Sequence, residues 1–450
     1  MQALMGKMPL PRSIIVVMII AVGLVAGSWV LAGARASAAP DLSDDYLSSA
    51  LDRAGTSTDR LIESLQERLK TTPDHWQSYS QLGVAYLQKA RETGDPTYYQ
   101  KAEGVLRKAL AVEPGDYVAT AAMGALDLAR HQFGSALEWG ERARQYNSYR
   151  TYAYGVIADA QIELGRYDEA VETLQAMVDL RPDISSYSRI SYIRELHGDV
   201  EGAIEAMQMA VQSGGPNMEG TDWTRVQLGH LYFNTGKLNE AETQYRMALE
   251  AHPEYVPAMA GLARARAARG EYDEAIKLYS AAVNRMPLPE YAIALGDVYE
   301  AAGRPAEARQ QFDLVRAMER LYLANGVDTD LEMALFAADH ADSQSIGEAV
   351  SRARRALEKR PTIYAASVLA WALYQSGQFA EAYDLSKQAL RLGTQDALLL
   401  FHAGMIADKA GHPDEARTYL EQALSINPHF SIRYAGAAAG TLAALSAPSP

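Results

Sequence analysis

The chain has 450 residues, more than a single compact hydrophobic core usually supports, so it must form several domains or an open stack of repeats. Its 42 basic and 56 acidic residues give a formal net charge of −14 without a basic block, which argues against a nucleic-acid partner. The lack of cysteine excludes disulfides, cysteine-ligated metals, thiol nucleophiles and cysteine-linked lipid anchors.

The N-terminal segment, residues 1–39, contains an uncharged apolar run at 13–34 that follows Lys7 and Arg12. The length of this run is sufficient to span a bilayer and favours an uncleaved signal-anchor, a transmembrane helix. The A-x-A pattern at residues 36–38 is instead typical of a cleaved signal peptide. Either alternative places the rest of the chain on the extracytoplasmic side, membrane-anchored, or secreted or periplasmic if the signal is cleaved.

Residues 40–75 are predicted to form a linker followed by an N-terminal half-repeat. The first part, up to about residue 58, is polar and rich in Ser and Asp. The segment 59–70, DRLIESLQERLK, has the apolar spacing of an amphipathic helix and stops before Pro73.

Beyond this half-repeat, alanine recurs at a nearly constant interval, and seven of the nine intervals are 33 or 34 residues long. A fixed period of this size marks a repeat architecture, in which each unit buries its apolar face against its neighbours. The uneven steps end at Ala241 and Ala349. The series comprises Ala102, Ala136, Ala170, Ala203, Ala241, Ala275, Ala308, Ala349, Ala382 and Ala416.

The segment 221–253 shows the pattern of helices and turns within one repeat unit most clearly. It predicts a first helix up to Thr235 and a turn at Gly236, where glycine suits a left-handed C-cap. A second helix follows, with Asn239 as its N-cap and Pro253 as its stop. The same helix–turn–helix pattern recurs along the chain.

A 34-residue unit of this kind, with L-G-x-x-Y at 228–232, small-residue tracks and a closing proline, resembles the tetratricopeptide repeat (TPR). The resemblance covers ten units over residues 76–428 and implies an all-α fold, a right-handed α-α superhelix. We expect an N-terminal hydrophobic helix before it and a C-terminal capping helix and tail at 429–450. Two irregularities, a lengthened helix and a turn without glycine, predict a hinge at 316–345.

Catalytic signatures are missing from the sequence. There is no phosphate-binding loop, dinucleotide fingerprint, nucleophile elbow or H-E-x-x-H motif. The recurring Asp-Glu pairs fall where second helices begin, and there capping and the helix dipole explain them. We therefore predict no enzyme activity, no catalytic residues and no cofactor.

The resemblance implies that the first helix of each unit lines a concave groove that binds a peptide or helical segment of a partner protein. Trp223, Val226, His230 and Phe233 share one face of such a helix, so they are partner anchors or inter-repeat packing, two alternatives of equal weight. For the aromatic group at 364–374 packing is favoured. The predicted partner-binding residues are Tyr152, Tyr192, Trp223, Val226, His230, Phe233, Asp159 and Glu195.

The acidic residues beside these aromatics favour a partner with basic and apolar residues, and membrane contact through the N-terminal helix. The sequence therefore predicts a non-catalytic interaction scaffold or adaptor, membrane-tethered or exported. The alternative is an accessory protein for a metal or small-molecule system, with a ligand near the irregular eighth unit at Asp339, His340 and Asp342. That spacing belongs to no strong metal motif, and a solvated helix end is favoured, so no metal ligands are predicted.

Overall fold

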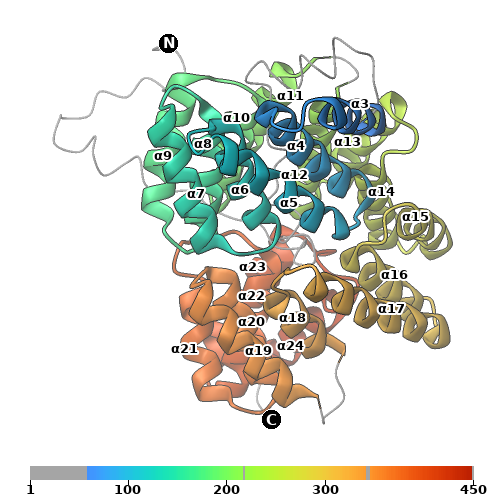
Figure 1. Cartoon of the computed structure of the whole chain (residues 1–450). Coiled ribbons are helices and arrows are strands. Elements are labelled where there is room, and N and C mark those ends of the chain that lie inside the picture. Colours follow the sequence, from blue (N-terminus) through green and yellow to red (C-terminus); the bar gives the residue numbers. More distant parts are fainter. Residues whose placement is uncertain (1–57, 216–217, 341–344, 448–450) are drawn as a thin grey trace.

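The computed structural model describes residues 58–215, 218–340 and 345–447, which contain 22 helices and no β-strand (Figure 1). The apolar run at 13–34 lies outside the described residues. Within the described ranges, no helix combines the length and the hydropathy needed to cross a membrane. The helices are α3 (Thr58–Thr71), α4 (Trp76–Thr93), α5 (Thr97–Val112), α6 (Tyr117–Ala129), α7 (Phe133–Tyr146), α8 (Thr151–Glu163), α9 (Tyr167–Leu180), α10 (Ile184–Glu195), α11 (Val200–Ser213), α12 (Glu219–Asn234), α13 (Leu238–Ala251), α14 (Val256–Ala268), α15 (Tyr272–Arg285), α16 (Pro289–Ala301), α17 (Pro305–Ala324), α18 (Asp330–His340), α19 (Ile346–Lys359), α20 (Ile363–Gln375), α21 (Phe379–Ala389), α22 (Ala397–Ala410), α23 (Pro413–Ile426) and α24 (Ala435–Ser446).

Helices α4 to α23 form ten helix pairs, with α3 packed on α4 and α24 on α23. In most of the pairs the first helix, helix A, also contacts the first helix of the next pair, as α4 does α6 and α18 does α20. Each alanine of the 34-residue series lies near the start of a second helix, helix B, and is at most 1% exposed. The all-α helical solenoid expected from the sequence is therefore confirmed.

Small residues permit the close helix crossings within this stack. Tyr245 of α13 is fully buried between two glycines, Gly229 of α12 and Gly261 of α14. A Cβ added to either glycine would lie 2.5 Å from the Tyr245 ring. The small-residue track in helix A therefore makes room for a large side chain of helix B, as ridge-into-groove packing requires.

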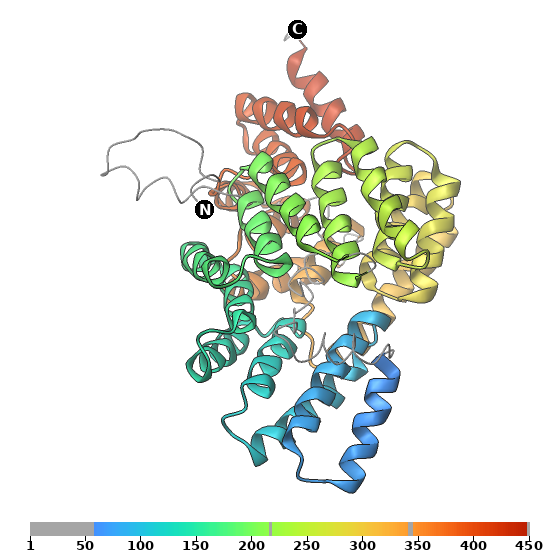
Figure 2. The same cartoon turned by 90° about the horizontal axis from the view of Figure 1, so that it is seen from above.

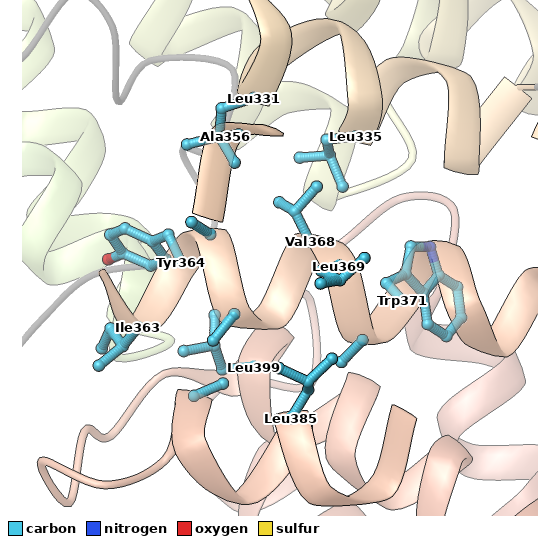
Figure 3. Close-up of a cluster of buried hydrophobic side chains, with 14 of the residues drawn as sticks. Leu331, Leu335, Ala356, Ile363, Tyr364, Val368, Leu369, Trp371, Leu385 and Leu399 are labelled. Carbon is cyan, nitrogen blue, oxygen red and sulfur yellow. The ribbon is translucent and has the colours of Figure 1, made fainter. Parts of the chain in front are cut away.

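The solenoid coils so far that its later pairs pack on its earlier ones. In Figure 1 the orange helices α18–α22 lie directly below the teal helices α6–α9, and Figure 2 shows the chain curving from blue through green to yellow. We call α4–α13 the first turn and α17–α24 the second turn. One apolar cluster joins α8–α10 to α18–α24, so the two turns share a core. Figure 3 shows part of it, with Val368 and Leu369 between Leu335 above and Leu385 below.

Hydrogen bonds between the turns join residues almost 200 positions apart. Arg130 Nε donates to the Asn325 carbonyl at 3.0 Å, and Gln132 Nε2 donates to that of Gly326 at 3.0 Å. Further along, Asn427 Nδ2 donates to the carbonyl of Phe233 at 2.8 Å. These pairs are 195, 194 and 194 residues apart. Hydrogen bonds between residues so far apart along the chain indicate that one superhelical turn stacks on the next.

A buried ion pair reinforces the contact. Arg360 of the second turn pairs with Glu163 of the first, and both side chains are 7% exposed. The same guanidinium lies 4.6 Å from the centre of the Phe133 ring and pairs with Glu332 at 3.2 Å. A buried charge that loses its partner is strongly destabilising, so this ion pair favours one fixed alignment of the two superhelical turns.

One sequence-based helix start was wrong. Helix α13 begins at Leu238 with Lys237 as N-cap, and Asn239 does not cap it. Asn239 Oδ1 instead accepts a hydrogen bond from Arg269 Nη2 at 2.7 Å, a contact between adjacent pairs. The C-terminal helix α24 begins at Ala435, because the Ser431 hydroxyl accepts hydrogen bonds from backbone N–H groups of 433 and 434 in a preceding turn.

The predicted hinge at 316–345 includes residues 341–344, which lie outside the described residues. Its described part contains the end of α17, which has 20 residues where most second helices have 14. The extension carries Asn325 and Gly326 to the first turn, where their carbonyls accept the hydrogen bonds given above. The hinge itself stays a prediction.

Candidate functional site: a cavity inside the superhelix

The concave side of the solenoid encloses a cavity of about 800 Å³. Its wall comes from the A helices α12, α14, α16 and α18, from the end of α4 and from α17. Helix α16 shows why the sequence turns one face inward: Glu290, Ile293, Asp297 and their neighbours at three- to four-residue spacing line the space. Trp223, Tyr255 and other aromatic residues give the wall a mainly apolar character.

The segment 429–435, between α23 and α24, closes one side of this cavity. Arg433 Nη1 donates to Asp297 Oδ1 at 3.0 Å, and Arg433 Nη2 donates to the Asp339 carbonyl at 2.9 Å. Tyr434 donates to Asp339 Oδ1 at 2.7 Å. The C-terminal segment therefore acts as a wall that spans α16 and α18, in addition to capping the last pair.

Most carboxylates in the wall already have a basic partner within the chain. Asp297 contacts His340 Nε2 at 2.8 Å as well as Arg433. Glu319 pairs with Arg352 at 2.5 Å, and Glu332 pairs with Arg360. The negative charge that the cavity wall presents to a ligand is consequently smaller than its number of acidic residues suggests.

Four polar side chains in the wall, those of Arg91, Glu290, Thr329 and Glu332, keep buried atoms without a hydrogen-bond partner in the part of the chain that the structure describes. Glu290 is 8% exposed and its Oε1 has no hydrogen-bond partner there. Burial, with a smaller contribution from Glu332, raises the pKa of Glu290 to about 8, so its carboxyl is mostly protonated at neutral pH. Arg91, near the end of α4, has Nε and Nη1 buried without a partner.

Tyrosines surround Arg91 and Glu290. Burial raises the pKa of Tyr99 to about 12 and raises that of Tyr322 well above its ordinary value. Both phenols therefore stay neutral and can donate or accept hydrogen bonds. Tyr322 donates to the Gly94 carbonyl at 3.4 Å, which ties this end of the cavity to the junction between the turns.

The structure divides the predicted aromatic face of α12. Trp223 is half-buried and lines the cavity, and His230 also lines it while its Nδ1 lies 2.8 Å from the Tyr245 hydroxyl. Val226 and Phe233 also line the cavity, but they are only 0% and 2% exposed and pack in the core between α12 and α14 as well. The Arg264 guanidinium covers the Phe233 ring at 3.8 Å. Val226 and Phe233 therefore take part in inter-repeat packing and also border the cavity, and their role in partner binding stays a prediction.

The remaining predicted residues lie beside the cavity. Tyr192, Asp159 and Glu195 line a small space of about 40 Å³ that also touches Trp223 and His230. Asp159 forms a bidentate ion pair with Arg189, at 2.8 Å through each oxygen, and is buried.

Glu195 Oε1 accepts a hydrogen bond from Asn234 at 3.4 Å. Tyr152 is buried in a core between α6 and α8, away from the large cavity, and burial raises its pKa.

The packing role favoured for the aromatic group at 364–374 is confirmed for Trp371. It is 2% exposed, stacks on Tyr374 and His402, and donates to Asp339 Oδ1 at 2.8 Å. Asp339 and His340 are thus engaged within the chain, and Asp342 lies outside the described residues. In the described ranges, no three His, Asp or Glu side chains are grouped as metal ligands.

Sequence reasoning missed Arg91 and Glu290, which are remote from the Trp223 face along the chain. A partial signal existed, because the lengthened turn at 93–99 brings Tyr99 to the cavity. Nothing in the local pattern distinguishes Glu290 from the other acids that begin helices, since its burial depends on the first turn packing over it.

Comparison with protein-family models finds tetratricopeptide repeats at residues 127–190, 226–289 and 289–313. A model described as anaphase-promoting complex, cyclosome, subunit 3 matches residues 342–423.

Two curated relatives are a TPR repeat-containing protein, YpiA, of Bacillus subtilis and a CTR9 homolog of Arabidopsis thaliana. The first is 21% identical over 275 residues, and the alignment covers 61% of this chain and 55% of the relative. The second is 27% identical over 176 residues, which cover 38% of this chain and 16% of the relative. The chain thus spans about half the length of the first and much less of the second.

Similar solved structures include the APC/C hetero-tetramer Cut9–Hcn1, with 15% identity, a TM-score of 0.38 and coverage of 94% of this chain and 97% of that one. A human IFIT1 dimer with PPP-AAAA has 14% identity, a TM-score of 0.46 and coverage of 90% and 95%. Yeast Tom70 has 12% identity, a TM-score of 0.37 and coverage of 86% and 96%. The repeat models and the helix pairs together show that this chain contains tetratricopeptide repeats, an architecture typical of protein-interaction scaffolds.

Proposed function

We propose that the protein is a non-catalytic adaptor that holds a short segment of a partner protein inside its superhelix. The N-terminal segment 1–39 tethers it to the membrane or directs its export, so that the repeats act on the extracytoplasmic side. The identity of the partner is set by the residues that line this cavity on the concave side.

The observation that supports this proposal is the 800 Å³ cavity on the concave side. Its volume lies within the range of sites that enclose most of a ligand's surface, about 300–1,000 Å³. The wall combines rigid aromatic side chains with few polar groups, which is the composition of binding hot spots.

A cavity-filling variant tests the proposal directly. Ala294 of α16 lines the cavity and is half-buried, so Ala294→Trp should occupy the space without removing a core contact. The matched control is Ala301→Trp, an exposed position on the same helix. In pull-downs from the native envelope fraction, we expect Ala294→Trp to lose partners that wild type and Ala301→Trp retain. Equal capture by all three proteins, with equal melting curves, would refute the cavity as the binding site.

The proposed location has its own test. N-terminal sequencing of the mature protein from its native cells distinguishes the alternatives, because a chain that begins at Ala39 requires cleavage after the A-x-A site. A chain that begins at its initiator residue and sediments with membranes supports the signal-anchor instead.

A further inference from the structure

We propose that Arg91 makes the cavity selective for an acidic partner segment, by binding one carboxylate of that segment at the junction between the two turns. This inference rests on the proposed function and deepens it. It also reverses the expectation from sequence, which favoured a basic partner.

The donor atoms of Arg91 carry the argument. Arg91 lines the cavity from the last turn of α4, and its Nε and Nη1 are buried without an acceptor in the described ranges. A buried N–H without an acceptor is costly, and either edge of a guanidinium, Nε with Nη2 or Nη1 with Nη2, matches a planar carboxylate with two parallel hydrogen bonds. Nε and Nη1 lie on different edges, so one carboxylate can accept from only one of these two atoms. A ligand carboxylate would supply an acceptor for one of these atoms, which the described residues leave without one.

The charges around Arg91 favour an anion over a cation. The half-buried carboxylates Asp297, Glu319 and Glu332 each have a basic partner in the chain, although Glu332 keeps its Oε2 without one in the described ranges. Glu219 lies at the exposed rim, away from the buried wall. A basic segment would need to displace existing ion pairs, whereas an acidic segment meets a cation whose N–H groups are unsatisfied.

Glu290 is compatible with this ligand. Because its carboxyl is mostly protonated at neutral pH, it does not repel a second carboxylate in the cavity. Its unpartnered Oε1 can accept a hydrogen bond from a backbone N–H of the segment. The tyrosines nearby, Tyr99 and Tyr255, provide apolar surface for the rest of the segment.

Affinity selection from three randomised pools of acetylated hexapeptides tests the inference. All pools use apolar and aromatic residues at the variable positions. The first carries one internal Glu and an amidated C-terminus, the second replaces Glu by Gln, and the third keeps Gln but has a free C-terminal carboxylate. Peptides retained by the full-length protein are quantified by mass spectrometry.

We expect wild type to retain the first or the third pool at least about tenfold more than the second, since a charge-assisted bidentate contact contributes this much or more. The first and third pools distinguish a side-chain carboxylate from a terminal one. Arg91→Gln should abolish the preference and still retain the second pool at the wild-type level. The control Arg107→Gln changes an exposed arginine that pairs with Glu103 on α5 and should keep the preference.

Equal retention of the three pools by wild type would overturn the acidic preference and leave the cavity as a binding site for apolar segments. No retention of any pool, with Ala294→Trp indistinguishable from wild type, would contradict both proposals. If Arg91→Gln does not fold, Arg91→Lys keeps the charge without the bidentate edge and should retain only part of the preference. The comparison among pools on wild type requires no variant.

Discussion

Within each helix pair a short loop joins the two helices, and these loops look alike in sequence in the first and the second superhelical turn. They differ in how closely other parts of the backbone approach them. Gly165 and Gly198, in the first turn, have φ of +69° and +90°, and Gly377 and Gly411, in the second, have +79° and +87°. A Cβ on Gly165 would lie 2.5 Å from the Pro361 carbonyl oxygen, and one on Gly198 would lie 2.6 Å from that of Gly393. A Cβ on Gly377 or Gly411 would meet nothing within 4 Å.

This comparison separates two reasons for the same residue. Every one of these glycines satisfies a left-handed backbone, which any helix–turn–helix unit of this type needs. Of these four, only Gly165 and Gly198, in the first superhelical turn, also leave room for the backbone of the second superhelical turn. The repeat motif therefore explains the glycine in the loop of each helix pair. At two of these four positions, the contact between the superhelical turns also requires the absence of a side chain.

The largest expected effect comes from breaking the buried ion pair between the turns. Arg360→Met leaves Glu163 buried without its main partner and should lower the free energy of unfolding by about 3–5 kcal/mol. The control Arg354→Met removes an exposed pair with Glu381 and should cost less than about 1 kcal/mol. Urea unfolding of both variants measures the difference, and equal costs would show that the turns do not depend on this pair.

The cavity wall predicts a pH dependence. The folded pKa of Glu290, about 8, lies above the ordinary value of 4.5, so the folded state holds a proton that the unfolded state loses. Its contribution is present below pH 4.5 and is lost as pH rises through 8. Relative to Glu290→Gln, wild type should therefore lose on the order of a few kcal/mol between pH 4.5 and 8. Urea unfolding at a series of pH values measures this, with Glu172→Gln on the exposed face of α9 as control. Parallel curves for wild type and Glu290→Gln would contradict the burial of the carboxyl.

The comparison of the glycines can be tested by replacing one loop glycine of each superhelical turn with alanine. Gly377→Ala meets only the backbone strain of a positive φ, about 1–2 kcal/mol. Gly165→Ala meets the same strain and also the Pro361 carbonyl, so we expect a further loss of about 1–3 kcal/mol. Small-angle scattering should show expansion for Gly165→Ala alone. Identical stability and size for the two variants would mean that the turns are not in contact in solution.

The smallest expected effect concerns two asparagines with the same local role. Asn147 and Asn427 are C-caps with φ of −154°, and each side-chain oxygen accepts a hydrogen bond from the backbone N–H two residues later. Asn427 also donates to the Phe233 carbonyl in the other turn. Asn427→Ala should therefore cost about 1–2 kcal/mol more than Asn147→Ala in thermal unfolding. Equal melting temperatures would assign both residues to local capping only.

Much of the fold could be predicted from the sequence because its causes are local. Helix spacing, the turn glycines and the buried alanines act within one unit or between adjacent units, so a 34-residue period reveals them. Individual helix ends were harder, as Asn239 shows, because a side chain from the next pair competes for the capping group. The candidate site was predicted in part: Trp223, Val226, His230 and Phe233 all line the cavity, whereas Tyr152 is buried in the core between α6 and α8.

By itself the sequence determined the helix pairs, their order and the all-α solenoid, since residues within about 40 positions fix each of these. Only the tertiary structure decided that the solenoid closes on itself, that a cavity lies inside, and that Arg91 and Glu290 face it. The physical reason is the accumulation of small rotations from one pair to the next. Their sum brings together residues about 195 positions apart, and no local pattern records that sum.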